Sequence, residues 1–185
     1  MEDNGKIENS YASRAFRMGA EFLTDDIIAE VAKEAVEKTS ILFQAIKPKG
    51  GEMPVVMGAG GSGILLHEAI GHALRATYME AGNVTEEEMI STVKKGIYAS
   101  SFTNGQVQIG AGDFTFFVKD GYLIENGKLT QPIKDINIIG NGPRALADIT
   151  MVGNNYKMDN GTWTCGKDGQ SCPVTCGMPS ALVSK

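Results

Sequence analysis

Both histidines of the chain lie in one short stretch, with a glutamate directly after the first. Residues 67–72 read His-Glu-Ala-Ile-Gly-His. A neutral imidazole is the commonest metal ligand in proteins, and a glutamate beside such a ligand can be the general base that activates water on zinc. The motif therefore predicts a hydrolytic metal site, with His67 and His72 as ligands and Glu68 as the base.

The spacing inside this motif differs from that of the familiar zincin helix. Three residues separate Glu68 from His72, where a zincin has two. Positions five apart on an ideal helix diverge by about 140° around its axis, so the two imidazoles could not reach one ion. A π-bulge would realign them, and Gly71 is a poor helix former that suits such a distortion. We therefore expect an irregular helix between His67 and His72.

A third ligand has to come from another part of the chain, because catalytic zinc usually has three protein ligands and one open position. The three cysteines are the obvious source, since a thiolate binds zinc well. Cys165 lies in a glycine-flanked segment expected to be a loop, while Cys172 and Cys176 could equally form a ligand pair. Spacing alone does not choose among them. An iron–sulfur centre is disfavoured because it needs four suitable ligands.

The composition is that of a globular protein. The 185 residues are 42% apolar and 21% charged, which is enough for one domain with a substantial core. A net charge of −5 without a basic patch argues against nucleic acid as a partner. Apolar runs are too short to span a bilayer, and the N-terminus has no secretory signal pattern. We therefore expect a cytoplasmic protein with no membrane segment, in which three cysteines are a poor disulfide framework.

Several elements must position the metal motif. An amphipathic helix is predicted for Phe22–Ala45, with Thr24 as its N-cap. A short apolar strand at 53–57 and a glycine-rich turn at 58–63 then precede a helix that carries the motif. The turn lacks the Gly-Lys-Ser/Thr ending of a phosphate loop, so we interpret it as a flexible lead into the helix.

The second half of the chain predicts one further helix and then strands. Thr85 and Glu88 have the capping-box pattern, and Gly96 is placed to end the helix. Asp-Gly at 120–121 and Asn-Gly at 126–127 lie between apolar runs and indicate hairpins, hence an antiparallel meander. The remaining candidates are a strand at 135–139 and a short helix at 143–147.

We therefore expect an α+β fold, with helices packed on an antiparallel β-sheet that contains a β-meander, and an irregular glycine-rich C-terminal loop. The predicted organisation is a single catalytic region, 1–185. Its parts are an N-terminal arm (1–20), a helical part with the metal motif (21–80), and a helix plus antiparallel sheet and cysteine loop (81–185).

Seven segments of the chain resemble the TldD/PmbA family of cytosolic zinc metallopeptidases. The segments are 51–56, 65–72, 93–98, 122–127, 139–143, 151–154 and 165–170. His-Glu-x-x-x-His followed far downstream by Cys-Gly-Lys is a signature of the TldD branch, whereas the PmbA branch, also called TldE, lacks the metal motif.

This resemblance implies roles by position. The implied zinc ligands are His67, His72 and Cys165. Glu68 matches the general base, while Cys172 and Cys176 fall where other members carry residues that do not bind the metal. The resemblance also implies unfolded or extended peptides as substrates, and either a TldE/PmbA-type partner or a homodimer.

The chain also departs from the family pattern. Family members are more than twice as long and have an N-terminal domain that we expect to be absent here. After the metal helix the sequence jumps at Leu74–Arg75, so we expect a block of strands and substrate-contacting loops to be missing. Two functions follow: a zinc-dependent peptidase of the HExxxH type, or a non-catalytic zinc-binding or partner-docking fragment with an incomplete substrate cleft.

Overall fold

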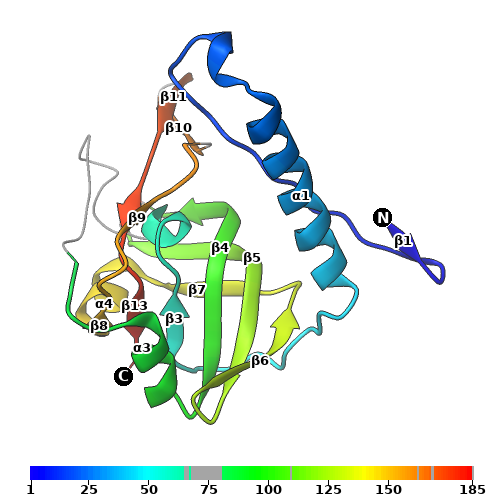
Figure 1. Cartoon of the computed structure of the whole chain (residues 1–185). Helices are drawn as coiled ribbons and strands as arrows, with labels where there is room; N and C mark the ends of the chain where they lie inside the picture. Colours follow the sequence, from blue (N-terminus) through cyan, green and yellow to red (C-terminus); the bar gives the residue numbers. More distant parts are fainter. Residues whose placement is uncertain (65–66, 68–80, 109, 162, 168, 185) are drawn as a thin grey trace. The chain divides into compact units, whose positions relative to one another are not determined.

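The computed structural model of the chain describes residues 1–64, 67, 81–108, 110–161, 163–167 and 169–184 (Figure 1). They form two compact units. The first consists of Met1–Ala45 and Asn160–Thr175, and the second of Ile46–Asp159 and Cys176–Lys185. No helix in these described ranges is long and apolar enough to cross a membrane. That the two units work as one catalytic region stays a prediction.

The first unit contains one long helix. α1 (Asp25–Leu42) begins after the N-cap Thr24, whose hydroxyl accepts a hydrogen bond from the backbone N–H of Ile27. The predicted helix and its cap are therefore confirmed. The other elements of this unit are β1 (Glu2–Asp3), β2 (Lys6–Ile7), the 3₁₀ turn η1 (Ala20–Phe22), β10 (Trp163–Lys167) and β11 (Gln170–Val174).

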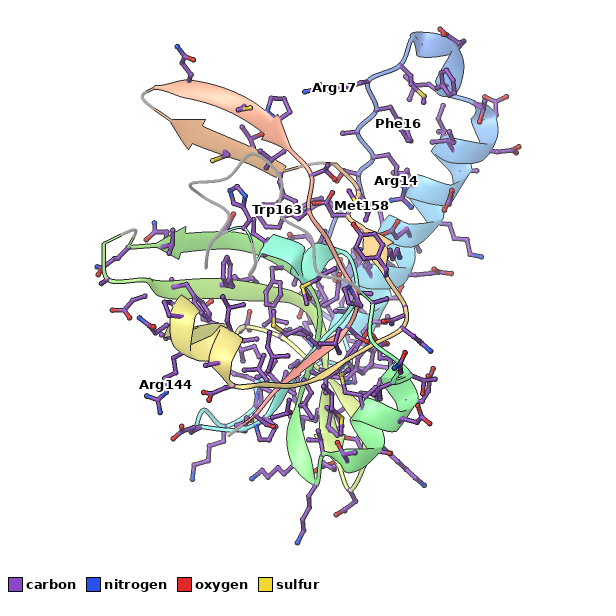
Figure 2. The ribbon with its side chains drawn as sticks, turned by 90° about the vertical axis from the view of Figure 1, so that its left-hand side faces the viewer. Arg14, Phe16, Arg17, Arg144, Met158 and Trp163 are labelled. Atoms are coloured by element: carbon purple, nitrogen blue, oxygen red, sulfur yellow. The ribbon has the colours of Figure 1, made fainter. Side chains whose placement is uncertain are left out.

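An ion-pair network attaches the N-terminal segment to α1. One carboxylate oxygen of Glu34 lies 2.7 Å from Arg14, and the other lies 2.7 Å from Lys38. Figure 2 shows Arg14 on the N-terminal segment beside the helix. Partial burial alone would raise the pKa of Glu34, but the hydrogen bonds from Lys38 and Arg14 outweigh it and lower that pKa.

In the described part of the chain, the second unit contains a seven-stranded, mostly antiparallel sheet. Its order is β6-β5-β4-β3-β13-β8, with β7 also paired to β5. Only the β3–β4 pair is parallel among the pairings of these described strands. The strands are β3 (Val55–Met57), β4 (Lys95–Val107), β5 (Asp113–Glu125), β6 (Lys128–Ile133), β7 (Asn137–Asn141), β8 (Ile149–Val152) and β13 (Ala181–Val183).

Short helices and a small two-stranded ladder also belong to the described part of this unit. They are η2 (Gly61–Gly63), α3 (Glu86–Thr92), α4 (Gly142–Ala147), β9 (Lys157–Met158) and β12 (Gly177–Met178). The helix predicted at 143–147 is therefore confirmed as α4. Helices and a largely antiparallel sheet make the fold α+β, as the sequence predicted.

Helix α3 packs on the sheet through a buried apolar cluster. The cluster contains Val56, Met89, Ile90, Val93, Ile124 and Leu182. The predicted capping box is present: the Thr85 hydroxyl accepts from the Glu88 N–H at 3.1 Å, and the Glu88 carboxylate accepts from the Thr85 N–H at 2.8 Å. The predicted C-terminus at Gly96 is wrong, because Val93 is already extended and buried in the cluster.

Two predicted turns have different outcomes. Asn-Gly at 126–127 joins β5 to β6, and both residues have positive φ, 50° and 75°. Asp-Gly at 120–121 does not form a hairpin, because β5 runs straight through it beside the long strand β4 (Figure 1). The register shifts between Ala99 and Ser101, which indicates a β-bulge at that point of the ladder.

The C-terminal third is more regular than the sequence indicated. The segment around Cys165, expected to be an irregular loop, is the hairpin β10–β11. Strand β13 also lies inside the main sheet, between β3 and β8. Glycine content therefore misled the prediction here, because a pairing partner far away in sequence can hold a glycine-containing segment in a strand.

Candidate metal centre

The glycine-rich segment that leads into the metal motif is held by backbone hydrogen bonds. Gly58 N–H donates to the Ala99 carbonyl at 2.8 Å, and Gly60 N–H donates to the Met178 carbonyl at 3.0 Å. Gly60 has a φ of 86°, a conformation that favours glycine. The segment is therefore anchored to β4 and β12 rather than being the flexible lead that we expected.

The last turn before the motif is closely packed. Ser62 is fully buried, and its hydroxyl donates to the Ala99 carbonyl at 3.4 Å. A Cβ atom at Gly63 would lie 2.9 Å from Cys176 Cβ and 3.1 Å from the Gly177 nitrogen. Only glycine fits there without a shift of the neighbouring backbone, so the start of the motif helix has a defined position in its unit.

His67 is the one member of the motif within the described residues. It is helical and half-buried. Its Nε2 atom is buried without a hydrogen bond in the described part of the chain, although the residue does make another interaction. Glu68 and His72 lie outside the described residues, and so does the predicted irregularity of the helix between the two histidines.

Cys165 is a buried thiol in the middle of β10. Its cross-strand partner in β11 is Cys172, which is exposed. Cys176 is buried in the second unit, where its N–H donates to Asp159 at 3.1 Å. Cys165, Cys172 and Cys176 are not in disulfide bonds.

His67 and Cys165 belong to different units, and each is described within its own. Across the described residues, no three His, Cys, Asp or Glu side chains are gathered as metal ligands would be. The assignment of the predicted ligand set therefore stays a prediction.

A partly buried polar network anchors the chain where it returns after the motif. Gly82 N–H donates to the Gly153 carbonyl at 2.7 Å. The carboxylate of Glu86 then accepts hydrogen bonds from the Tyr98 hydroxyl at 3.0 Å and from the Asn155 amide at 3.2 Å. Asn155 in turn accepts from the Ser180 hydroxyl at 2.8 Å.

This network also contacts the segment that precedes the motif. A Cβ atom at Gly58 would lie 2.9 Å from the Tyr98 hydroxyl oxygen. Burial, reinforced by the negative charge of Glu86, raises the pKa of Tyr98 far above its usual range, so the phenol stays protonated as a donor. The sequence reasoning missed this network. Its only local signal was an acidic residue in the first turn of α3, which is common at helix N-termini.

The sequence model of one protein family, the PmbA/TldA metallopeptidase C-terminal domain, matches residues 74–185 of the chain. The chain belongs to this family. A metalloprotease TldD homolog of Haemophilus influenzae is 27% identical, over all of this chain and 59% of the relative. Another, of Buchnera aphidicola from Acyrthosiphon pisum, is 47% identical over 56% of this chain and 22% of the relative.

Two further comparisons concern zinc and the fold. A zinc metalloprotease TldD homolog of Saccharolobus solfataricus is 33% identical over 60% of this chain and 25% of the relative. The crystal structure of TldE from Thermococcus kodakarensis matches 84% of this chain and 54% of its own length, with a TM-score of 0.57 and 11% identity. At this identity the structural match shows the fold alone.

The chain spans only part of its relatives. The alignment with the Haemophilus protein has 284 positions for 185 residues, so that relative carries extra residues between matched parts. The family match begins at residue 74, next to the junction Leu74–Arg75. The missing block expected at that junction stays a prediction.

Proposed function

We propose that this chain is the zinc-binding region of a TldD-type peptidase that hydrolyses peptide bonds in unfolded or extended peptides. One observation carries the proposal: a His-Glu-x-x-x-His motif and a downstream Cys-Gly-Lys occur together in a chain of a metallopeptidase family. The name of the Saccharolobus relative supports zinc as the metal. The proposed ligands are His67, His72 and Cys165.

The donor set fits zinc. Two imidazoles and one thiolate are three protein ligands, which leaves the open fourth position of a catalytic site. His67 would bind as a neutral imidazole, which is the commonest metal ligand in proteins. Cys165 would bind as a thiolate, which cancels one of the two charges of the ion.

When bound, zinc would supply Lewis-acid polarisation of the scissile carbonyl and would lower the pKa of water. In the proposed reaction the carboxylate of Glu68 takes a proton from the attacking water. It then delivers that proton to the leaving amine, so one residue is first base and then acid. A charge-neutralising thiolate ligand makes the metal a weaker acid, and this increases the importance of Glu68 as a base.

We further propose that the chain works in the cytoplasm with a TldE/PmbA-type partner or as a homodimer. A TldE-type partner would share the fold of this chain, because a TldE matches it in structure. The expected lack of a nucleic-acid partner stays a prediction.

One observation favours a second function. The chain spans 59% of its Haemophilus relative, so a part of the substrate cleft present in full-length members can be absent here. The alternative is a non-catalytic zinc-binding or partner-docking fragment.

Glu68→Gln distinguishes these functions when the zinc-loaded 185-residue chain is assayed with an unfolded peptide. For a peptidase, we expect this variant to keep its zinc and to lose about 10²–10⁴-fold in kcat, the usual contribution of a general base. Glu87→Gln is the matched control, because Glu87 is an exposed carboxylate of α3, and it should keep full activity.

Each contrary result has a definite meaning. If both the unsubstituted chain and Glu68→Gln bind zinc but hydrolyse no peptide, the result would support the docking fragment. Cys165→Ser tests the third ligand separately, by zinc titration of the reduced chain. An unchanged zinc affinity in that variant would remove Cys165 from the site.

A further inference from the structure

Two cysteines face each other across the hairpin β10–β11. The register pairs Cys165 directly with Cys172, between the pairs Thr164–Pro173 and Gly166–Ser171. Directly opposite residues of an antiparallel pair have Cα atoms about 4.5–5.5 Å apart and Cβ atoms about 4.5–5.5 Å apart on one face. A disulfide needs a Cα separation of about 4.4–6.8 Å and a Cβ separation of about 3.5–4.5 Å. The hairpin therefore brings both sulfurs within bonding reach after a small adjustment.

The two thiols differ in access. Cys172 is exposed, whereas Cys165 is buried. A Cβ atom at Gly166 or Gly169 would meet nothing within 4 Å, so the end of the hairpin is open. The third thiol, Cys176, is buried and belongs to the other unit, outside the β10–β11 ladder. An oxidant in solution would therefore meet Cys172 first, and the nearest thiol along the ladder is Cys165.

We propose that Cys165 and Cys172 form a peroxide-sensitive pair that closes into a cross-strand disulfide and so withdraws Cys165 from the metal site. Formation of the disulfide rests on the hairpin register alone. The withdrawal of Cys165 from the metal site rests on the proposed function, in which Cys165 is a zinc ligand. A structural disulfide framework is not implied, since both thiols are free in the resting chain.

The chemistry balances with hydrogen peroxide as the oxidant. The Cys172 sulfur attacks one peroxide oxygen, the O–O bond breaks, and the products are a sulfenic acid and water. The Cys165 sulfur then displaces the sulfenic hydroxyl as a second water, forming the S–S bond. A dithiol reductant reverses the step by thiol–disulfide exchange. A disulfide sulfur is no longer a thiolate, and the thiolate is the form that binds metal.

The test uses the zinc-loaded 185-residue chain, limited hydrogen peroxide, alkylation of the remaining thiols and tryptic digestion. Cleavage after Lys167 separates the peptide of Cys165 from that of Cys172, so the disulfide appears as a linked pair lighter by two hydrogen atoms. We expect this pair to form, zinc to be released in proportion as read by a chromogenic chelator, and dithiothreitol to restore binding.

Two single variants identify the bond. Cys172→Ser should give no linked peptide and keep its zinc at the peroxide dose that releases zinc from the unsubstituted chain. Cys176→Ser is the matched control and should still give the linked peptide, because Cys176 lies outside the hairpin.

Absence of the linked peptide in the unsubstituted chain, or a link from Cys165 to Cys176, would overturn the disulfide. A complete disulfide with zinc still bound would overturn the withdrawal of Cys165. The proposed function is tested by a different measurement, the zinc titration of the reduced chain, which uses no oxidant. It fails if Cys165→Ser binds zinc as tightly as the unsubstituted chain does.

Discussion

Replacing Gly63 with alanine should strain the segment that leads into the metal motif. The new Cβ atom would lie 2.9 Å from Cys176 Cβ, 3.1 Å from the Gly177 nitrogen and 3.2 Å from the Cys176 carbonyl carbon. Carbon atoms in good contact are about 3.5–4.0 Å apart, so the two segments must separate by roughly half an ångström or more. The neighbours are backbone and Cβ atoms, and a change of rotamer therefore cannot relieve the contact.

Overpacking of this kind costs about 1–3 kcal/mol. For a chain of this size, each kcal/mol lowers Tm by about 2–4 °C. We therefore expect Gly63→Ala to lower Tm by about 2–12 °C, as measured by circular dichroism. His67 follows this turn by four residues in the sequence, so zinc affinity should fall as well.

Gly61→Ala is the matched control in the same turn. Its Cβ atom would meet nothing closer than 3.7 Å, and neither Gly61 nor Gly63 has a positive φ. The control should stay within about 0.5 kcal/mol of the unsubstituted chain. Combining Gly63→Ala with Cys176→Gly removes the shortest contact and should reduce the cost of the alanine. Equal Tm values for Gly61→Ala and Gly63→Ala would refute the reasoning.

Two further predictions concern pH and are read from urea unfolding. The folded-state pKa of Glu34 lies below its ordinary value of 4.5. Burial raises this pKa, but the hydrogen bonds from Lys38 and Arg14 lower it by more. The ionised Glu34 therefore stabilises the fold above pH 4.5, and this stabilisation is lost as the pH falls below 4.5. In Glu34→Gln the free energy of unfolding should decrease less steeply with falling pH. The same pH dependence in the variant and the unsubstituted chain would contradict this prediction. Burial and the charge of Glu86 raise the pKa of Tyr98 above 10. The protonated phenol therefore stabilises the fold below pH 10, and this stabilisation is lost as the pH rises further. Tyr98→Phe should cost about 1–3 kcal/mol at neutral pH and show a shallower alkaline loss; an equally steep loss would exclude Tyr98 as its source.

Short-range signals in the sequence predicted the local structure well. The cap at Thr24, the box of Thr85 with Glu88 and the Asn-Gly turn at 126–127 all appear as expected. Each depends on atoms within about four residues, so the sequence contains the whole interaction. The boundary of α3 was wrong because it depends on Val93 reaching a core formed by distant strands.

The two Asp-Gly pairs of the chain show where such signals fail. At 120–121 the pair lies inside β5, where the Ser101 hydroxyl donates to Asp120 at 2.5 Å. A Cβ atom at Gly121 would lie 2.6 Å from the Tyr98 carbonyl oxygen, so the glycine permits close approach of β4 rather than a turn. At the second Asp-Gly of the sequence, β10 ends at Lys167 and β11 begins at Gln170. Identical local sequences thus differ in outcome because strand pairing, a tertiary effect, decides between them.

The hairpin at 168–169 also bears on how the cysteines should be grouped. Spacing along the chain did not choose among the three cysteines, but the structure pairs Cys172 with Cys165 and places Cys176 in the other unit. In a hairpin with a two-residue connection, residues equally far from the turn lie opposite each other. Reading the second Asp-Gly as the turn would therefore have predicted the Cys165–Cys172 pair from the sequence. It follows that the neighbour of the proposed zinc thiolate is a second thiol, and the redox state of Cys172 is the variable to control when zinc binding by this chain is measured.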